Sequence, residues 1–218
     1  MAFLKISIAQ CHKMVYNEDN VKKEPHGMKK ETLYHIFSHF PELETERLYL
    51  RAMRVSDAAD MYDYAKRPEV TKYLLWSPHP DVTYTRRYLE YLAGRYRLGQ
   101  FYDWASISKA NGRMIGTCGF VRFDCPHNSA EIGYVLNPDY QGQGYMYEAA
   151  QRVMKFGFSV LGLHRIEARY MVENLPSRQV MEKLGMSFEG VKRSSMLVKG
   201  LYRDIGYCAI LANEFRAE

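Results

Sequence analysis

The segment Ile132–Met146 constrains the fold more than any other part of the sequence. It begins with an apolar run, Ile132–Leu136, which is stopped by Asn137-Pro138, a pair that favours turns. Two glycines follow within the loop Gln141–Met146. Beyond the loop, apolar or small residues recur at steps of three and four as far as Val160, which is the period of an amphipathic helix. The segment therefore predicts a strand, a glycine loop and a helix in immediate succession.

This glycine loop is suited to bind a phosphate group. The first turn of a helix leaves backbone N–H groups without partners and carries a partial positive charge. Gly142 and Gly144 have no side chain that would keep a phosphate away, and glycine adopts positive φ angles readily. The loop lacks the Gly-Lys-Ser/Thr of a Walker loop and the third glycine of a Rossmann fingerprint. An ordinary tight turn between a strand and a helix is the alternative interpretation.

The wider segment resembles a known motif. Gln141-x-x-Gly144-x-Met146 is similar to the acyl-CoA-binding motif of the GNAT N-acetyltransferases, Gln/Arg-x-x-Gly-x-Gly/Ala. Met146 departs from its last position, which is tolerated in the RimJ/RimL-like, ribosomal-protein N-acetyltransferase-like branch that this chain resembles most. Further segments keep the order and spacing of that branch over residues 41–215: Asn174-x-x-Ser177, Glu182–Gly190 and Gly200-x-Tyr202-x-Asp204.

Length and composition predict one folded domain. The 218 residues are 47% hydrophobic and 14% aromatic, which is typical of a globular protein and not of a disordered one. The family resemblance places a GNAT N-acetyltransferase domain at residues 41–218. Residues 1–40 contain the polar segment Lys22–Gly27, broken by proline and glycine, and are expected to be a loosely ordered N-terminal extension.

Charge, cysteine content and hydropathy exclude several classes of function. The net charge of +5 allows an anionic ligand such as a nucleotide cofactor, but no dense basic tract indicates nucleic-acid binding. Four cysteines without C-x-x-C or zinc spacing predict reduced, buried thiols and no metal: Cys11, Cys118, Cys125 and Cys208. No signal peptide and no bilayer-spanning apolar run is found, so no membrane partner and a cytoplasmic location are expected. Monomer and homodimer both remain open.

Periodicity and turn residues predict the other elements. Strands are expected at residues 44–51, 103–109, 113–123, 130–136, 164–172, 186–192 and 202–211. Helices are expected at residues 56–65, 82–98 and 174–185. This alternation predicts an α/β sandwich with a mixed sheet. The GNAT resemblance implies that the sheet is mostly antiparallel, with one splayed parallel pair of strands and flanking helices.

The resemblance also implies where acetyl-CoA, the acetyl donor, binds. The strands at residues 131–136 and 164–172 would splay apart, and their unpaired backbone groups would receive the pantetheine arm like an added strand. The backbone amide near Leu136 would then stabilise negative charge on the thioester oxygen. The residues expected to contact acetyl-CoA are Val135, Leu136, Gln141, Gly142, Gln143, Gly144, Tyr145, Met146, Asn174 and Ser177.

Four side chains are candidates for the chemistry or for the acceptor. Glu131 is expected to act through water as the general base, and a solvated or salt-bridged strand glutamate is the alternative. Ser177 is expected to protonate or bind the CoA thiolate, with helix capping as the alternative. Trp76 and His79, in a proline-rich loop, are candidates for the wall of the acceptor site. The alternative is that Trp76 only packs in the fold and that His79 is exposed and has no role.

The resemblance implies transfer of the acetyl group to a primary amine. The N-terminal α-amine of a protein, such as a ribosomal protein, is the preferred acceptor, because its pKa of about 7.7–8 lies below the value of about 10.4 for lysine. A small amine, such as a polyamine or an antibiotic, and an acyl-CoA-binding protein whose chemistry has lapsed are the alternatives. An open groove at residues 73–80 and 191–201 would favour a peptide acceptor, and a closed acidic pocket a small cation.

Overall fold

A single mixed sheet organises the computed structural model, which describes residues 27–216. In these residues the sheet has eight strands in the order β1-β2-β3-β4-β5-β6-β8-β7. All neighbours are antiparallel except β5 and β6. The sheet therefore has the predicted mostly antiparallel form. The strands are β1 Leu43–Glu44, β2 Leu48–Arg51, β3 Asp103–Ser108, β4 Met114–Asp124, β5 Ser129–Leu136, β6 Arg165–Met171, β7 Ser187–Val198 and β8 Leu201–Leu211.

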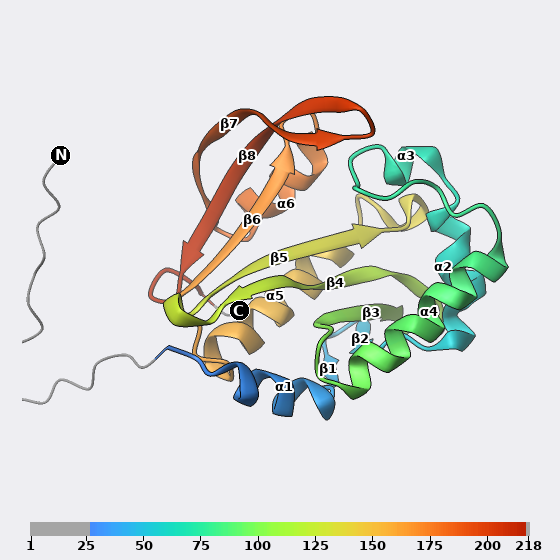
Figure 1. Cartoon of the computed structure of the whole chain (residues 1–218), viewed down its shortest axis with the longest axis horizontal. Helices are drawn as coiled ribbons and strands as arrows, with labels where there is room; N and C mark the ends of the chain where they lie inside the picture. Colours follow the sequence, from blue (N-terminus) through green and yellow to red (C-terminus); the bar gives the residue numbers. More distant parts are fainter. Residues whose placement is uncertain (1–26, 217–218) are drawn as a thin grey trace, which may run out of the picture.

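Helices cover both faces of this sheet (Figure 1). Successive residues of a strand point to opposite faces. On β3, Trp104 packs in the same core cluster as residues of α1 and α5, whereas Ala105 packs with residues of α2 and α4. The sequence predicted all but α1 and α3 of the helices, which are α1 Lys30–Ser38, α2 Ala58–Ala65, α3 Pro68–Thr71, α4 Val82–Arg97, α5 Tyr145–Ser159 and α6 Leu175–Lys183.

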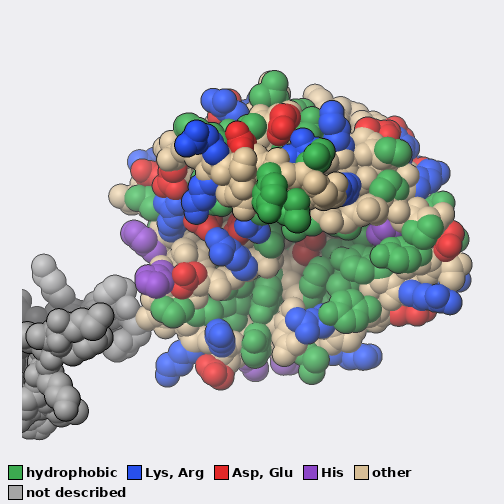
Figure 2. Space-filling view, turned by 45° about the horizontal axis from the view of Figure 1, so that its top comes forward, with side chains coloured by type: hydrophobic (Ala, Val, Ile, Leu, Met, Phe, Trp, Pro, Cys, Tyr) green, Lys and Arg blue, Asp and Glu red, His purple; other side chains and the backbone are tan. Residues whose placement is uncertain are grey.

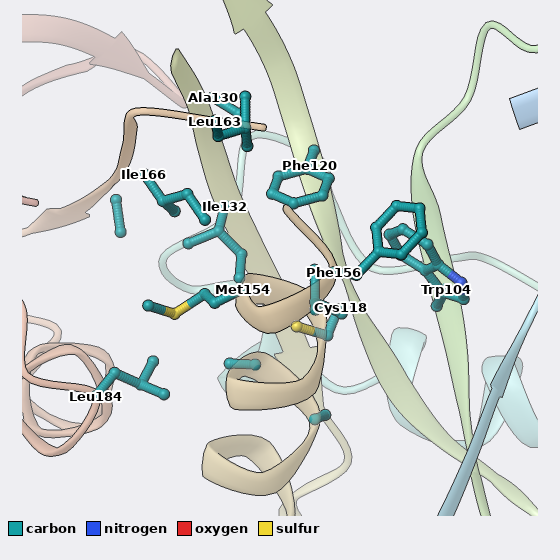
Figure 3. Packing of buried hydrophobic residues seen from close by; sticks show 14 of the residues in the cluster. Trp104, Cys118, Phe120, Ala130, Ile132, Met154, Phe156, Leu163, Ile166 and Leu184 are labelled. Atoms are coloured by element: carbon teal, nitrogen blue, oxygen red, sulfur yellow. The ribbon is translucent and has the colours of Figure 1, made fainter. Parts of the chain in front are cut away.

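The larger core lies between α5 and the sheet. Figure 3 shows Met154 and Phe156 of α5 beside Cys118 and Phe120 of β4 and Ile132 of β5. All five side chains are buried. Met146, Ala150 and Val153, whose spacing helped to predict the helix, are buried in the same core, whereas Val160 at its end is 61% exposed. The burial of this apolar face holds the start of α5 directly beyond the end of β5.

α1 packs on this core, although it belongs to the predicted N-terminal extension. Leu33 and Phe37 are buried, and the ring of Phe37 lies 5.7 Å from that of Trp104 and 6.1 Å from that of Phe156, measured between centroids. Residues 1–26, which hold Cys11 and most of the predicted loose arm, lie outside the described residues. The boundary at residue 40 stays a prediction.

The three cysteines of the described residues are buried free thiols: Cys118, Cys125 and Cys208. Within residues 27–216, no cluster of three or more His, Cys, Asp or Glu side chains is placed to hold a metal ion. None of the helices described between these limits combines the length and the apolar character needed to cross a bilayer.

The parallel pair of strands, β5 and β6, is joined only at its start. Residues 129–131 pair with residues 165–167. Beyond these pairs, β5 remains bonded to β4 as far as Leu136, and β6 remains bonded to β8 as far as Met171. The facing edges of the two strands therefore carry N–H and C=O groups that no strand of the described sheet pairs. This is the splayed pair that the sequence predicted.

Asp103, at the start of β3, is a poorly hydrated carboxyl group. Burial raises its pKa to about 7, although hydrogen bonds from Thr117 and from the backbone of Trp104 work in the opposite direction. Its Oδ1 atom has no hydrogen-bond partner among the described residues. Ionisation of Asp103 near neutral pH should therefore destabilise the folded state.

We expect the free energy of unfolding to fall as the pH rises from 5 to 8. Folded Asp103 keeps its proton up to its raised pKa, whereas the unfolded carboxyl ionises near pH 4, so about 2 kcal/mol of stability should be lost over this range. Urea unfolding at both pH values should show this loss in the wild type and not in Asp103→Asn. Glu90→Gln, on the exposed face of α4, is the control. The same pH dependence in wild type and Asp103→Asn would contradict this explanation.

Candidate active site

Two adjoining cavities lie where β5 and β6 diverge. The larger cavity, of about 500 Å³, is lined by the end of β5, the glycine loop and the first turn of α5. The smaller cavity, of about 200 Å³, is lined by residues 131–134, 169–171 and 73–75. Figure 2 shows a hollow across the middle of one face of the molecule, with hydrophobic side chains beside it. The two cavities meet at the residues that line both: Tyr73, Leu74, Tyr134, Asn174 and Ser177.

The glycine loop has the geometry of an anion site. Gly142 and Gly144 have φ angles of 74° and 81°, a region that glycine adopts without strain. Gly144 is the N-cap of α5 and no side chain caps the helix there. The helix's first hydrogen bond runs from the N–H of Glu148 to the carbonyl of Gly144, at 3.1 Å. The N–H groups of the first turn therefore remain for an anionic ligand at the positive end of the helix dipole.

Arg47, which the sequence analysis did not identify, holds this loop in place. Its backbone N–H and its Nε bind the two carboxylate oxygens of Glu148, at 2.8 and 2.6 Å. Its Nη1 donates to the carbonyl of Gln143 at 2.9 Å, and its guanidinium lies 4.4 Å from the ring centroid of Tyr145. Burial of Glu148 opposes ionisation, but hydrogen bonds from Thr45 and Arg47 outweigh it and lower the pKa. Arg47 thus neutralises a carboxylate that would repel an anion.

Nine of the ten residues predicted to bind acetyl-CoA line the larger cavity, and Gln143 is the exception. The side chain of Gln143 donates to the carbonyl of Asp139, and its own carbonyl accepts from Arg47, so it supports the loop. Met146, which departs from the family motif, is only 5% exposed and packs in the core. The core beneath α5 therefore accommodates its side chain. The nine are Val135, Leu136, Gln141, Gly142, Gly144, Tyr145, Met146, Asn174 and Ser177.

Ser177 lies at the junction of the two cavities. Asn174 caps α6, because its side-chain oxygen accepts from the N–H of Ser177 at 3.4 Å. Tyr134 OH donates to the Ser177 carbonyl at 2.9 Å and lies 3.2 Å from the Ser177 Oγ. Burial raises the pKa of Tyr134, so this phenol remains protonated at neutral pH. The sequence analysis did not identify Tyr134 as a site residue.

Glu131 lines the smaller cavity with its side chain only 5% exposed. Its Oε2 accepts a hydrogen bond from Arg122 Nε at 2.8 Å, and Arg169 Nε lies 2.6 Å from its Oε1. A carboxylate has about four acceptor positions, so each oxygen can still accept from a water molecule. The structure thus shows a salt-bridged glutamate on a strand, which was the alternative interpretation of the sequence. The role of Glu131 as a base stays a prediction.

Trp76 and His79 line neither of these two cavities. Trp76 packs beside the second core cluster, and its ring lies 5.2 Å from that of His79. His79 is buried and not exposed, its Nδ1 lies 2.8 Å from Thr85 Oγ1, and burial lowers its pKa. Residues 73–75 of the same loop reach the cavities. A contact of Trp76 or His79 with the acceptor stays an untested prediction.

Residues 47–187 match the family model of the acetyltransferase (GNAT) domain. The chain belongs to the GNAT acetyltransferase family. This GNAT chain is 37% identical over 173 residues to the uncharacterized N-acetyltransferase p20 of Bacillus licheniformis, an alignment that covers 79% of this chain and 97% of p20. The crystal structure of a GNAT acetyltransferase from Bacillus anthracis is 31% identical, with a TM-score of 0.72, and the match covers 80% of this chain and all of that chain.

Two further relatives have names that specify an acceptor. YdaF of Bacillus subtilis strain 168, provisionally named a ribosomal N-acetyltransferase, is 26% identical over 79% of this chain and 96% of its own. The spermidine N(1)-acetyltransferase of Escherichia coli K12 is 30% identical over 51% of this chain and 60% of its own. The family confirms the prediction of an acetyl-CoA-dependent N-acetyltransferase. The uncapped helix start, the open glycines and the unpaired strand edges suit this donor.

We expect Gly142→Glu to weaken CoA binding at least about tenfold, because it places a negative charge beside the amides of the glycine loop. Gly162→Glu is a matched control. Gly162, beyond the other end of α5, has a φ of 66°, and an added Cβ would meet no atom within 4 Å at either glycine. The two variants thus share the backbone strain and the added charge. Isothermal titration with CoA should give near wild-type affinity for Gly162→Glu, and equal affinity of both variants would contradict the assigned anion site.

Proposed function

We propose that this enzyme acetylates the N-terminal α-amine of a protein or peptide. The smaller cavity carries this proposal, because it is not an acidic pocket. Glu131 is the one carboxylate among its lining residues, and two arginines already pair with it. Leu75 lines the cavity and is 66% exposed, so the cavity extends to the surface, where a peptide chain can continue. A polyamine would meet little negative charge there.

The chemistry of the amine supports the same acceptor. The nucleophile must be neutral, and the pKa values of an α-amine and a lysine-type amine differ by more than two units, or roughly 3 kcal/mol. A modest base suffices for an α-amine, and Glu131, which is paired with Arg122 and Arg169, is the one carboxylate in the smaller cavity. In this proposal Glu131 receives the proton of the amine through a water molecule as the amine attacks the thioester carbonyl.

Ser177 and Tyr134 support the departure of the thiolate. As the carbon–sulfur bond breaks, the sulfur leaves with the electron pair of the bond, and Ser177 donates to it a hydrogen bond, or a proton that water then replaces, from its position between the two cavities. Tyr134 holds Ser177 through its carbonyl and lies within hydrogen-bond distance of its hydroxyl. Met181 and Met196, which also line the smaller cavity, contribute apolar wall and no proton.

A small amine is the second candidate acceptor. The E. coli relative named for spermidine favours it, whereas YdaF and the RimJ/RimL-like motifs favour a protein N-terminus. Thiol release from acetyl-CoA should be measured with a library of N-terminal peptides, with spermidine and with aminoglycosides. We expect turnover of peptides with an uncharged first residue. Faster turnover of spermidine than of any peptide would favour the second candidate, and tight CoA binding without any turnover would indicate lapsed chemistry.

We expect Glu131→Gln to lower kcat by roughly 10²–10⁴-fold, which is the usual contribution of a general base. The variant should also lose the part of the pH dependence of kcat that is due to ionisation of the base. Glu167→Gln is the matched control, because Glu167 is the register partner of Glu131 on β6 and binds Arg122, but does not line either cavity. It should retain kcat within a few-fold. A wild-type pH profile in Glu131→Gln, or an equal loss in both variants, would leave Glu131 a structural residue.

A further inference from the structure

The charges that line the smaller cavity are unequally accessible. Its lining residues include one carboxylate, Glu131, and one guanidinium, Arg169. The side chain of Glu131 is 5% exposed and that of Arg169 is 31% exposed. Of the two charged groups, the positive one is therefore the more accessible.

Arg169 has hydrogen-bonding capacity to spare. A guanidinium has five N–H groups, and the contact of Arg169 with Glu131 runs through Nε, which leaves the terminal Nη1 and Nη2 groups for a ligand. Arg122 differs in this respect. Its Nε binds Glu131, its Nη2 donates to Glu167 at 2.7 Å, and it lies outside the smaller cavity with its side chain 60% exposed.

The rest of the smaller cavity is mostly apolar. Besides β4, β5 and α6, three further parts of the chain contribute to its walls: the loop after α3, the end of β6, and the β7–β8 hairpin. The apolar side chains among them are Leu74, Leu75, Met171, Met196 and Ile205. An amine with an apolar group and a hydrogen-bond acceptor on the adjacent carbon matches these walls and Arg169 together. The first residue of a peptide has this arrangement, whereas a polyamine offers only methylenes and further positive charges, which Arg169 would repel.

We infer that Arg169 is a specificity determinant, which binds the carbonyl oxygen of the first acceptor residue while the apolar walls receive its side chain. This inference rests on the proposed function and narrows it to peptides whose first residue is apolar. Arg169 acts on substrate choice, and its ion pair with Glu131 fixes its position. A cationic first side chain is disfavoured, because it would enter beside Arg169.

The test compares Arg169→Gln with Arg122→Gln. Each variant removes one of the two guanidiniums that pair with Glu131, but only Arg169 lines the smaller cavity. Steady-state kinetics would use a peptide that begins with methionine and an analogue in which a trans carbon–carbon double bond replaces the first peptide bond, so that the carbonyl oxygen is lost and no basic amine is added. We expect Arg169→Gln to raise KM for the peptide at least about tenfold, as the loss of a hydrogen bond to a charged group predicts, and to leave KM for the analogue unchanged. Arg122→Gln should change neither KM by more than about twofold.

Arg169→Lys keeps the charge beside Glu131 but not the planar fork, and its KM for the peptide should lie between those of wild type and Arg169→Gln. CoA affinity and thermal unfolding of each variant would confirm that the fold is intact. An equal rise in KM for both acceptors, or in both arginine variants, would overturn the inference and leave the proposed function standing. Acetylation of spermidine and of no peptide by the wild type would overturn both.

Discussion

The parting of β5 and β6 after three residue pairs is the constraint on which the site depends. Backbone N–H and C=O groups that leave a sheet must find other partners, and an extended ligand can supply them. The outer edges of both strands stay bonded, to β4 and to β8, so the gap cannot close without breaking those ladders. The packing of α5 on β4 and β5 then sets the glycine loop at the wide end of the gap.

Charged side chains bridge the strands at the narrow end of the same gap. Arg122 of β4 binds Glu131 of β5 and Glu167 of β6, and Arg165 of β6 binds Glu189 of β7 at 2.7 Å. Each of these carboxylates lies within ion-pair distance of at least one arginine, so the buried Glu131 is not left uncompensated. The same arrangement that permits Glu131 to lie in an apolar cavity also engages both of its oxygens. A catalytic role for Glu131 therefore has to operate through the acceptor positions that the arginines leave.

Contacts between distant parts of the chain complete both ends of the site. Arg47 precedes β2, yet it binds Glu148 and Gln143 around the start of α5. At the other end, Lys199 in the β7–β8 turn donates to the carbonyl of Thr71 in α3 at 2.6 Å. That contact ties the hairpin to the loop whose residues 73–75 line the smaller cavity. The larger and the smaller cavity thus each depend on one basic side chain that reaches across the fold.

Local sequence pattern determined β5, the glycine loop, α5 and nearly all of the other elements. Turn residues and apolar spacing indicate these elements because they depend only on residues that are neighbours in the sequence. The resemblance of short sequence motifs to those of the GNAT family identified nine residues of the larger cavity. Only the tertiary structure decided that Arg47 supports the loop, that Arg169 lines the smaller cavity, and that Tyr134 joins Ser177. Arg47 and Glu148 are 101 positions apart in the sequence, and Tyr134 and Ser177 are 43 apart. Arg169 and Glu131 lie on separate strands. Only the packing of the folded chain brings these pairs together.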